Sequence, residues 1–147
     1  MINLSNFAEI LSALMFEHNN INGKSLANAL GIAAPTITRY LKSERTPSVE
    51  NLILLADYFN CSIDYLLGLE EENSNLTFKP CPPFSQQLVY LTKYFKLTYY
   101  AFYHTVKISE STFFEWKNGT TVPTIDSIIK IAKHFDCRID FVLGREN

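Results

Sequence analysis

Apolar side chains recur at three- and four-residue spacing along almost the whole chain, which is the pattern of amphipathic helices. Between residues 47 and 68 this spacing predicts a helix that follows Ser48, an N-cap residue, and a shorter helical turn at residues 63–67. Gly68 then suits a left-handed helix end. The positions that share the inner face of the longer helix are Leu52, Leu55, Ala56 and Phe59.

The chain contains an internal sequence repeat. Residues 123–144 repeat residues 47–68 at a constant offset of 76, and the differences between them are mostly conservative. A period of this length is one small domain in two copies and not a short solenoid repeat. Each copy has roughly 65–70 residues, which is near the lower size for independent folding. The chain is therefore expected to fold as two tandem units.

Three further helices are predicted upstream in the first copy, at residues 6–18, 23–30 and 34–42. The second copy matches this order, with a helix that buries Phe84, Leu88 and Leu91, a helix after Thr98, and a helix that begins after Ser109. The fold class is all-α. The predicted divisions are a domain at 1–69, a linker at 70–83 that is acidic and then proline-rich, and a domain at 84–147.

The net charge of −2 gives no indication of a nucleic-acid partner, but its distribution does. Residues 1–73 carry a net charge of −5 and residues 74–147 a net charge of +3. The four cations of the first part are confined to about twenty residues. They are Lys24, Arg39, Lys42 and Arg45.

Catalytic and targeting signals are absent from the sequence. His18, His104 and His134 fall on different helices without the spacing of metal ligands, and there is no glycine-rich phosphate loop or nucleophile motif. The sequence predicts no enzyme, no cofactor and no metal. We also expect no membrane span and no secretory signal, and the three cysteines suit a reducing cytoplasm.

Two short helices joined by Gly31, Ile32 and Ala33 predict a helix-turn-helix. The segments that carry this pattern are 25–32, 36–40, Pro47, 55–59 and 63–68. Here the sequence resembles the lambda-repressor-like (Cro/repressor, or XRE) helix-turn-helix family, over nearly the whole chain twice apart from the linker. The resemblance implies two five-helix domains, with the third helix of a DNA-binding copy in the major groove of double-stranded DNA.

In the first copy the third helix is expected to direct Ile37 and Tyr40 inward. The residues left near the groove are Ala34, Pro35, Thr36, Thr38 and Arg39. Arg39 suits a bidentate bond to guanine O6 and N7, and the threonine methyl groups suit thymine. The residues expected at the sugar–phosphate backbone are Lys42, Ser43 and Arg45 after this helix, and Lys24 and Ser25 with the free amides of the second helix.

The second copy differs at the equivalent places. Glu110 stands where the first copy has Ala34, and Glu115 stands where it has Arg39, so phosphates would repel this helix. A group of aromatic residues, namely Tyr99, Tyr100, Tyr103 and Phe114, is a candidate protein interface. Its simplest partner is a second copy of the chain, although rings of this kind also stack on unpaired bases.

These features predict a cytoplasmic bacterial or phage transcriptional regulator. The first domain reads DNA, and the second dimerises or recruits a protein partner. The alternative is a protein-binding module, such as an antitoxin or a phage-encoded inhibitor, in which the aromatic second domain holds the partner. A purely structural scaffold would leave Arg39, Lys42 and Arg45 unexplained.

Overall fold

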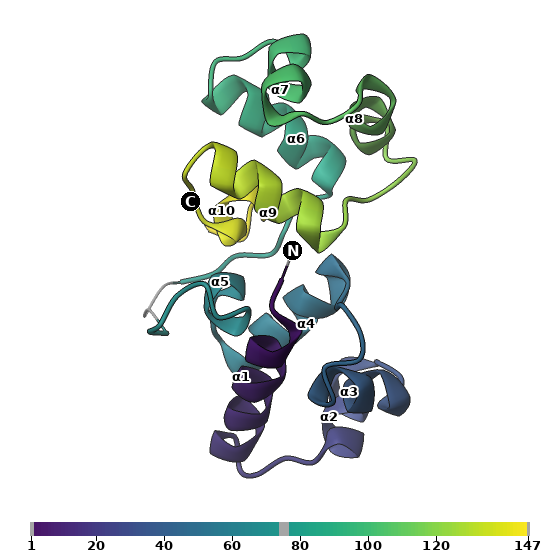
Figure 1. Ribbon diagram of the computed structural model, residues 1–147, viewed down its shortest axis with the longest axis vertical. Coiled ribbons are helices and arrows are strands. Elements are labelled where there is room, and N and C mark those ends of the chain that lie inside the picture. The colour runs from purple at the N-terminus through teal and green to yellow at the C-terminus, as the bar shows by residue number, and fades with distance from the viewer. Residues whose placement is uncertain (1, 74–76, 147) are drawn as a thin grey trace. The chain divides into compact units, whose positions relative to one another are not determined.

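The computed structural model describes residues 2–73 and 77–146. Within those ranges the regular secondary structure is entirely α-helical (Figure 1). The chain divides into two compact units, residues 1–76 and 77–147. The first unit holds α1 (Leu4–Glu17), α2 (Gly23–Leu30), α3 (Ala34–Leu41), α4 (Val49–Phe59) and α5 (Ile63–Leu66). The second holds α6 (Phe84–Tyr94), α7 (Tyr99–Val106), α8 (Glu110–Lys117), α9 (Ile125–His134) and α10 (Ile139–Leu143). The all-α prediction with two helix-turn-helix units is confirmed.

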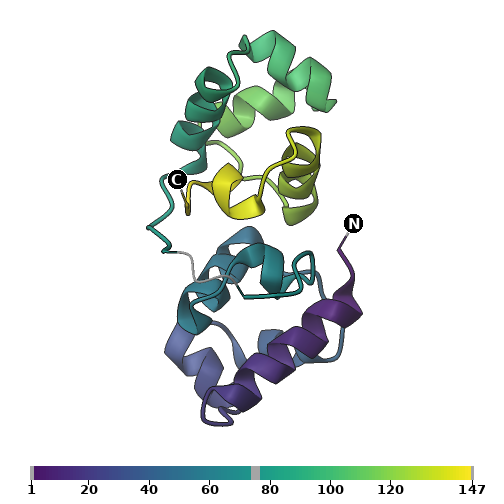
Figure 2. The ribbon, with the colours of Figure 1, turned by 90° about the vertical axis from the view of Figure 1, so that its left-hand side faces the viewer.

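The starts of α1, α2, α4 and α5 in the first unit are fixed by side-chain caps. The Asn22 carboxamide accepts from the Ser25 N–H at the start of α2, and the Ser48 hydroxyl accepts from the Asn51 N–H at the start of α4. Figure 2 shows α1 of this unit along its length. The first unit closes over a core whose fully buried members include Phe7, Leu11, Leu26, Ile37, Leu52 and Leu55.

The second unit repeats this construction with its own caps. The hydroxyls of Thr98, Ser109 and Thr124 accept backbone N–H groups at the starts of α7, α8 and α9. The buried core residues here include Leu88, Leu91, Phe102, Phe113, Trp116, Ile128 and Val142. The two copies therefore bury equivalent positions, which is why the same fold tolerates their different surfaces.

The expected linker at 70–83 has two ends that contact the unit beside them. Its residues 74–76 lie outside the described residues. At one end, Glu70 Oε1 accepts from the Ser62 hydroxyl at 2.9 Å. At the other, the Lys79 N–H donates to the Arg145 carbonyl at 2.8 Å. The domain boundaries at 69 and 84 remain predictions, and these bonds show that the neighbouring residues contribute to each fold.

Candidate nucleic-acid interface

The turn between α2 and α3 is set by backbone conformation. Gly31 ends α2 with φ 68°, a left-handed value that glycine adopts without a Cβ penalty. The Ile32 N–H then donates to the Ala27 carbonyl at 3.0 Å, which completes the helix end. Ala33 is extended and Pro35 lies in the first turn of α3, where a missing N–H costs nothing. The chain thus begins α3 directly after the turn.

The rotation of α3 about its axis is fixed by two buried side chains. Ile37 and Tyr40 are buried, the Tyr40 ring packs edge-on against Phe7, and the Tyr40 hydroxyl accepts from Asn51 Nδ2 at 2.9 Å. This inward face is the one expected from the sequence. The outer face presents the remaining predicted groove residues: Ala34, Pro35, Thr38 and Arg39 are exposed, and Thr36 is half-buried.

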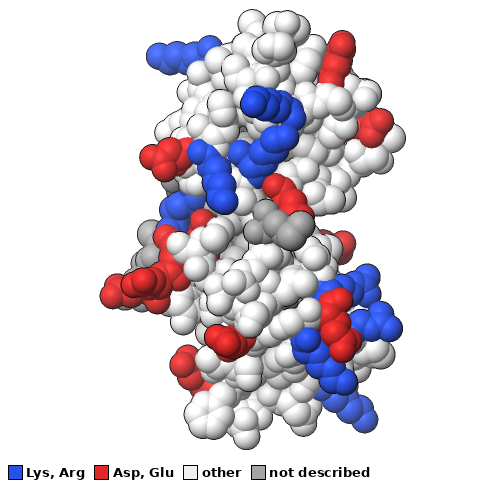
Figure 3. Space-filling model, in the orientation of Figure 1, with Lys and Arg blue, Asp and Glu red and all other residues white. Residues whose placement is uncertain are grey.

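The four cations of the first unit gather around this helix. Figure 3 shows Lys and Arg side chains over the part of the first unit that contains α2 and α3, with carboxylates among them. All four of these residues, Lys24, Arg39, Lys42 and Arg45, are exposed, as is Glu44 between the last two. The surface is therefore basic on balance, with three cations at or just after the end of the helix that presents its outer face.

Two of the predicted contact residues have bonds within the fold. The Ser25 N–H donates to Asn22 Oδ1 at 2.8 Å, so the expectation of a free amide at that residue is wrong because the N-cap occupies it. Ser43 is half-buried with φ 59°, and its hydroxyl donates to the Leu4 carbonyl at 3.3 Å. Ser43 therefore ties the end of α3 to the start of α1. Its role at the sugar–phosphate backbone remains a prediction.

Sequence reasoning missed the residue that orients α3 from outside it. Asn51 lies on α4, eleven positions after Tyr40, and its carboxamide holds the Tyr40 hydroxyl. No local signal marks this pair, because a single asparagine in an amphipathic helix is most simply a surface residue.

In the second unit the equivalent helix presents different chemistry. Glu110 and Glu115 of α8 are exposed, while Phe113 and Trp116 are buried. The predicted aromatic residues do come together: Tyr99 and Tyr103 lie 6.2 and 6.4 Å from Phe114, and Tyr100 lies 5.6 Å from Tyr103, between ring centroids. We call Tyr99, Tyr100, Tyr103 and Phe114 the aromatic cluster.

The aromatic cluster is only partly open to solvent. The Tyr100 side chain is 62% exposed, whereas Tyr99, Tyr103 and Phe114 are half-buried against the fold. The Lys117 ammonium lies 5.3 Å from the Tyr99 ring centroid, within cation–π distance. Burial, the Glu110 carboxylate and Tyr100 together raise the pKa of Tyr103 above its ordinary value of 10.0.

Comparison with known proteins agrees with this geometry. The Helix-turn-helix family matches residues 15–66, and the Cro/C1-type HTH DNA-binding domain matches residues 91–146. The chain is a tandem helix-turn-helix protein of the Cro/C1, or XRE, family. The two matches begin in the last turns of α1 and α6. Each match includes the complete helix-turn-helix of its unit.

The chain is also similar to a curated bacterial protein. The HTH-type transcriptional regulator AnsR of Bacillus subtilis (strain 168) is 46% identical over 46 residues, which are 31% of this chain. The chain spans about 40% of the length of that relative. No solved structure matches the chain.

Other kinds of site are not evident in the part of the chain that the structure describes. Across residues 2–73 and 77–146, no three His, Cys, Asp or Glu side chains are grouped to hold a metal ion. No helix in those ranges is long and apolar enough to cross a membrane.

Proposed function

We propose that this tandem helix-turn-helix protein is a transcriptional regulator that binds specific sequences in double-stranded DNA through its first unit. The observation that carries the proposal is the outer face of α3, whose rotation is fixed by Ile37 and Tyr40 and which is surrounded by exposed cations. Phosphate contacts supply affinity and position, and base contacts supply specificity. A basic helix held in one orientation offers both.

The roles divide along α3. Arg39, exposed in its last turn, is suited to a guanine, and Thr36 and Thr38 are suited to thymine methyl groups. Ala34 and Pro35 have no polar groups for base edges, so DNA shape contributes to the choice of site there. Lys24, Lys42 and Arg45 are assigned to phosphates because they flank the helix-turn-helix. Ser25 and Ser43 add hydroxyl groups close to these cations.

The second unit is assigned a different role. Exposed Glu110 and Glu115 would face phosphates if α8 entered a groove, which is unfavourable. We infer that the aromatic cluster instead binds a second copy of the chain. A two-fold dimer would place two copies of α3 on a palindromic site with half-sites about one helical turn apart. A regulator of this kind works in the cytoplasm, a reducing compartment that suits its three cysteines.

An antitoxin or a phage-encoded inhibitor is the second candidate. It is favoured by exposed Tyr100 beside a half-buried group of rings, because aromatic residues are enriched where proteins bind one another. In this case the second unit would hold a different protein, and DNA binding by α3 would serve autoregulation.

The test is selection of a random duplex library on the intact protein, followed by anisotropy titration of the enriched sequence across a salt series. Recovery of a palindrome, with affinity that falls steeply as salt rises, supports a dimeric regulator. Recovery of a single half-site retains DNA reading by α3 and contradicts dimerisation on DNA. The absence of any enriched sequence contradicts the proposed function.

Dimerisation is tested separately by sedimentation at micromolar concentration. Replacement of Tyr100 by Ser should convert a dimer to a monomer, because Tyr100 is the most exposed ring of the aromatic cluster. Tyr90→Ser is the matched control, since Tyr90 is also exposed but lies on α6. A wild-type protein that is monomeric with and without DNA would refute the assignment.

A further inference from the structure

A second basic surface lies on the second unit. It consists of four exposed lysines: Lys96 after α6, Lys107 at the end of α7, and Lys130 and Lys133 on α9. We call these residues the lysine surface. Figure 3 shows Lys and Arg side chains gathered over the part of this unit that contains α9.

Packing within the unit brings these segments together. Lys130 Nζ donates to the Lys107 carbonyl at 2.7 Å, so the Lys130 side chain on α9 reaches the end of α7. Phe95, next to Lys96, stacks on Phe135, just past α9, with ring centroids 4.0 Å apart. Three separate segments therefore present their lysines around one edge of the fold.

The carboxylates near this edge are fewer than its cations. Asp126 lies one helical turn before Lys130, Asp136 follows α9, and Glu110 lies three residues after Lys107. His134 lies in the last turn of α9 beside Lys133. Four lysines against three carboxylates leave the edge positive.

The fold does not require these lysines. The first copy has Gly31, Leu54 and Asp57 where the second has Lys107, Lys130 and Lys133, and it has Asn19 and Asn20 in the loop that matches Lys96. The first unit forms the same five helices with none of these cations.

Lys107 is the most informative member. It ends α7 in the left-handed conformation, with φ 67°, where its counterpart Gly31 has φ 68°. A side chain in this conformation costs about 1 kcal/mol relative to glycine. The backbone therefore disfavours lysine at this position relative to glycine.

We propose that the second unit uses the lysine surface to bind the phosphate backbone of DNA that flanks the site read by α3. This rests on the proposed function. The partner is DNA because the same chain carries a DNA-reading unit, so the second contact is intramolecular once the first has formed. Exposed Glu110 and Glu115 keep α8 out of the groove, while the lysine surface supplies affinity that is independent of base sequence.

Lysines near helix C-termini also interact favourably with the helix dipole, which is a purely structural explanation for their presence. Lys107→Gly separates the two explanations, because it removes a charge and relieves a left-handed backbone at the same time. The full chain should unfold at a higher temperature while its DNA affinity becomes less dependent on salt. The slope of log K against log salt should fall in magnitude by about 0.9, the value for one phosphate contact.

The corresponding double variant, K130Q/K133Q, should reduce that slope by about 2 on a long duplex and leave the ranking of site sequences unchanged. The difference should disappear on a short duplex that holds only the selected site. The control, K79Q, removes an exposed charge from the second unit outside the lysine surface and should retain the wild-type slope.

Wild-type salt slopes for both K107G and K130Q/K133Q would overturn this proposal, as would an equal change in the control. Failure of the proposed function has a different signature. It would appear as Arg39→Ala binding every duplex as the wild type does, whatever the lysine variants do. The two failures are therefore distinguishable in one set of titrations.

Discussion

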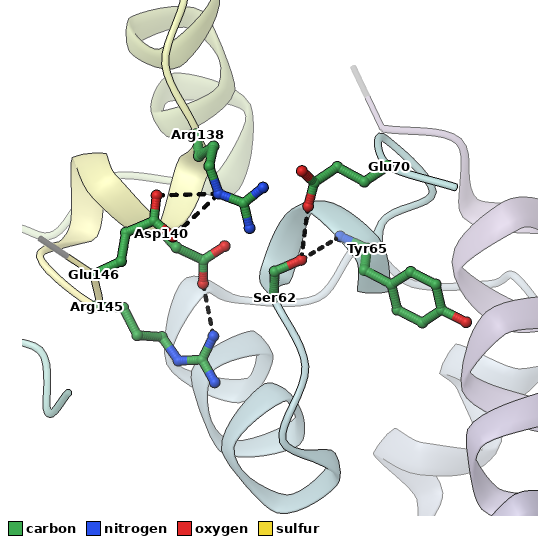
Figure 4. Close-up of polar contacts among 7 residues, drawn as sticks. All are labelled: Ser62, Tyr65, Glu70, Arg138, Asp140, Arg145 and Glu146. Atoms are coloured by element: carbon green, nitrogen blue, oxygen red, sulfur yellow. Dashed lines mark hydrogen bonds and ion pairs between the residues drawn. The ribbon is translucent and has the colours of Figure 1, made fainter. Parts of the chain in front are cut away.

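Arg145 donates a hydrogen bond from Nη1 to Asp140 Oδ1 at 2.6 Å, and both side chains are buried, with 1% and 0% of their surface exposed (Figure 4). The Arg145 guanidinium also lies 3.9 Å from the centre of the Phe78 ring. The Arg145 guanidinium thus links the end of α10 to the segment before α6. This contact joins the first and last parts of the second unit.

Removal of one partner should destabilise the second unit strongly. We expect Asp140→Ala to lower its free energy of unfolding by about 3 kcal/mol, because the Arg145 charge would remain buried without its carboxylate. Trp116 is the single tryptophan and is buried in this unit, so its fluorescence in a urea titration reports the loss. Asp136→Ala, at an exposed carboxylate, is the control. Equal midpoints for the two variants would contradict the expectation.

Much of the fold could be predicted because its signals are local. The sequence places α2 at residues 23–30, as observed, and the N-cap predicted at Ser48 is confirmed, as are the helix starts predicted after Thr98 and Ser109. Helix ends are less exact, since α1 begins two residues before the predicted start. The contact of Arg145 with Phe78 was not predictable, because it joins positions 67 residues apart with no pattern between them.

The candidate site was predictable to a similar degree. Helical periodicity alone assigns Ile37 and Tyr40 to the core and thereby leaves Arg39 outside. The side-chain bond from Ser43 to the Leu4 carbonyl depends on tertiary packing between α3 and α1, which periodicity does not encode. The lysine surface was missed for the same reason, because its members come from three segments.

The turn of the first helix-turn-helix should depend on its glycine. Gly31→Ala should lower the free energy of unfolding of the first unit by about 1 kcal/mol. A Cβ at Gly31 would have no neighbour within 4 Å, so the cost is confined to the left-handed backbone. Circular dichroism in urea measures the change. The control is Gly23→Ala, where the added Cβ meets Ile37 at an ordinary 3.5 Å and no loss is expected. A Gly31→Ala protein as stable as the wild type would show that the turn relaxes.

The aromatic cluster should give the second unit a dependence on alkaline pH. The raised pKa of Tyr103 means that the folded state favours the neutral phenol. Its stabilising contribution is complete below pH 10.0 and is lost as pH rises through the folded pKa. Ultraviolet absorbance titration of the wild type minus Tyr103→Phe isolates this phenol.

Glu110→Gln should lower the pKa of Tyr103 toward its ordinary value, because the nearby carboxylate favours the neutral form. Glu115→Gln removes the other exposed charge of α8 and serves as the comparison. If both variants leave the titration of Tyr103 unchanged, the carboxylate makes no contribution, and burial and Tyr100 account for the raised pKa.

Replacement of Arg39 and replacement of Lys42 should weaken DNA binding in different ways. If Arg39 bonds to a guanine, Arg39→Ala should cost about 1–3 kcal/mol on the selected duplex and relax the preference at one position. Lys42 is assigned to a phosphate, so Lys42→Ala should weaken binding to all duplexes alike and reduce the magnitude of the salt slope by about 1. Anisotropy titration against the selected duplex and its single-base variants separates these results. An equal loss on every duplex for Arg39→Ala would reassign Arg39 to the backbone and leave specificity to Thr36, Thr38 and DNA shape.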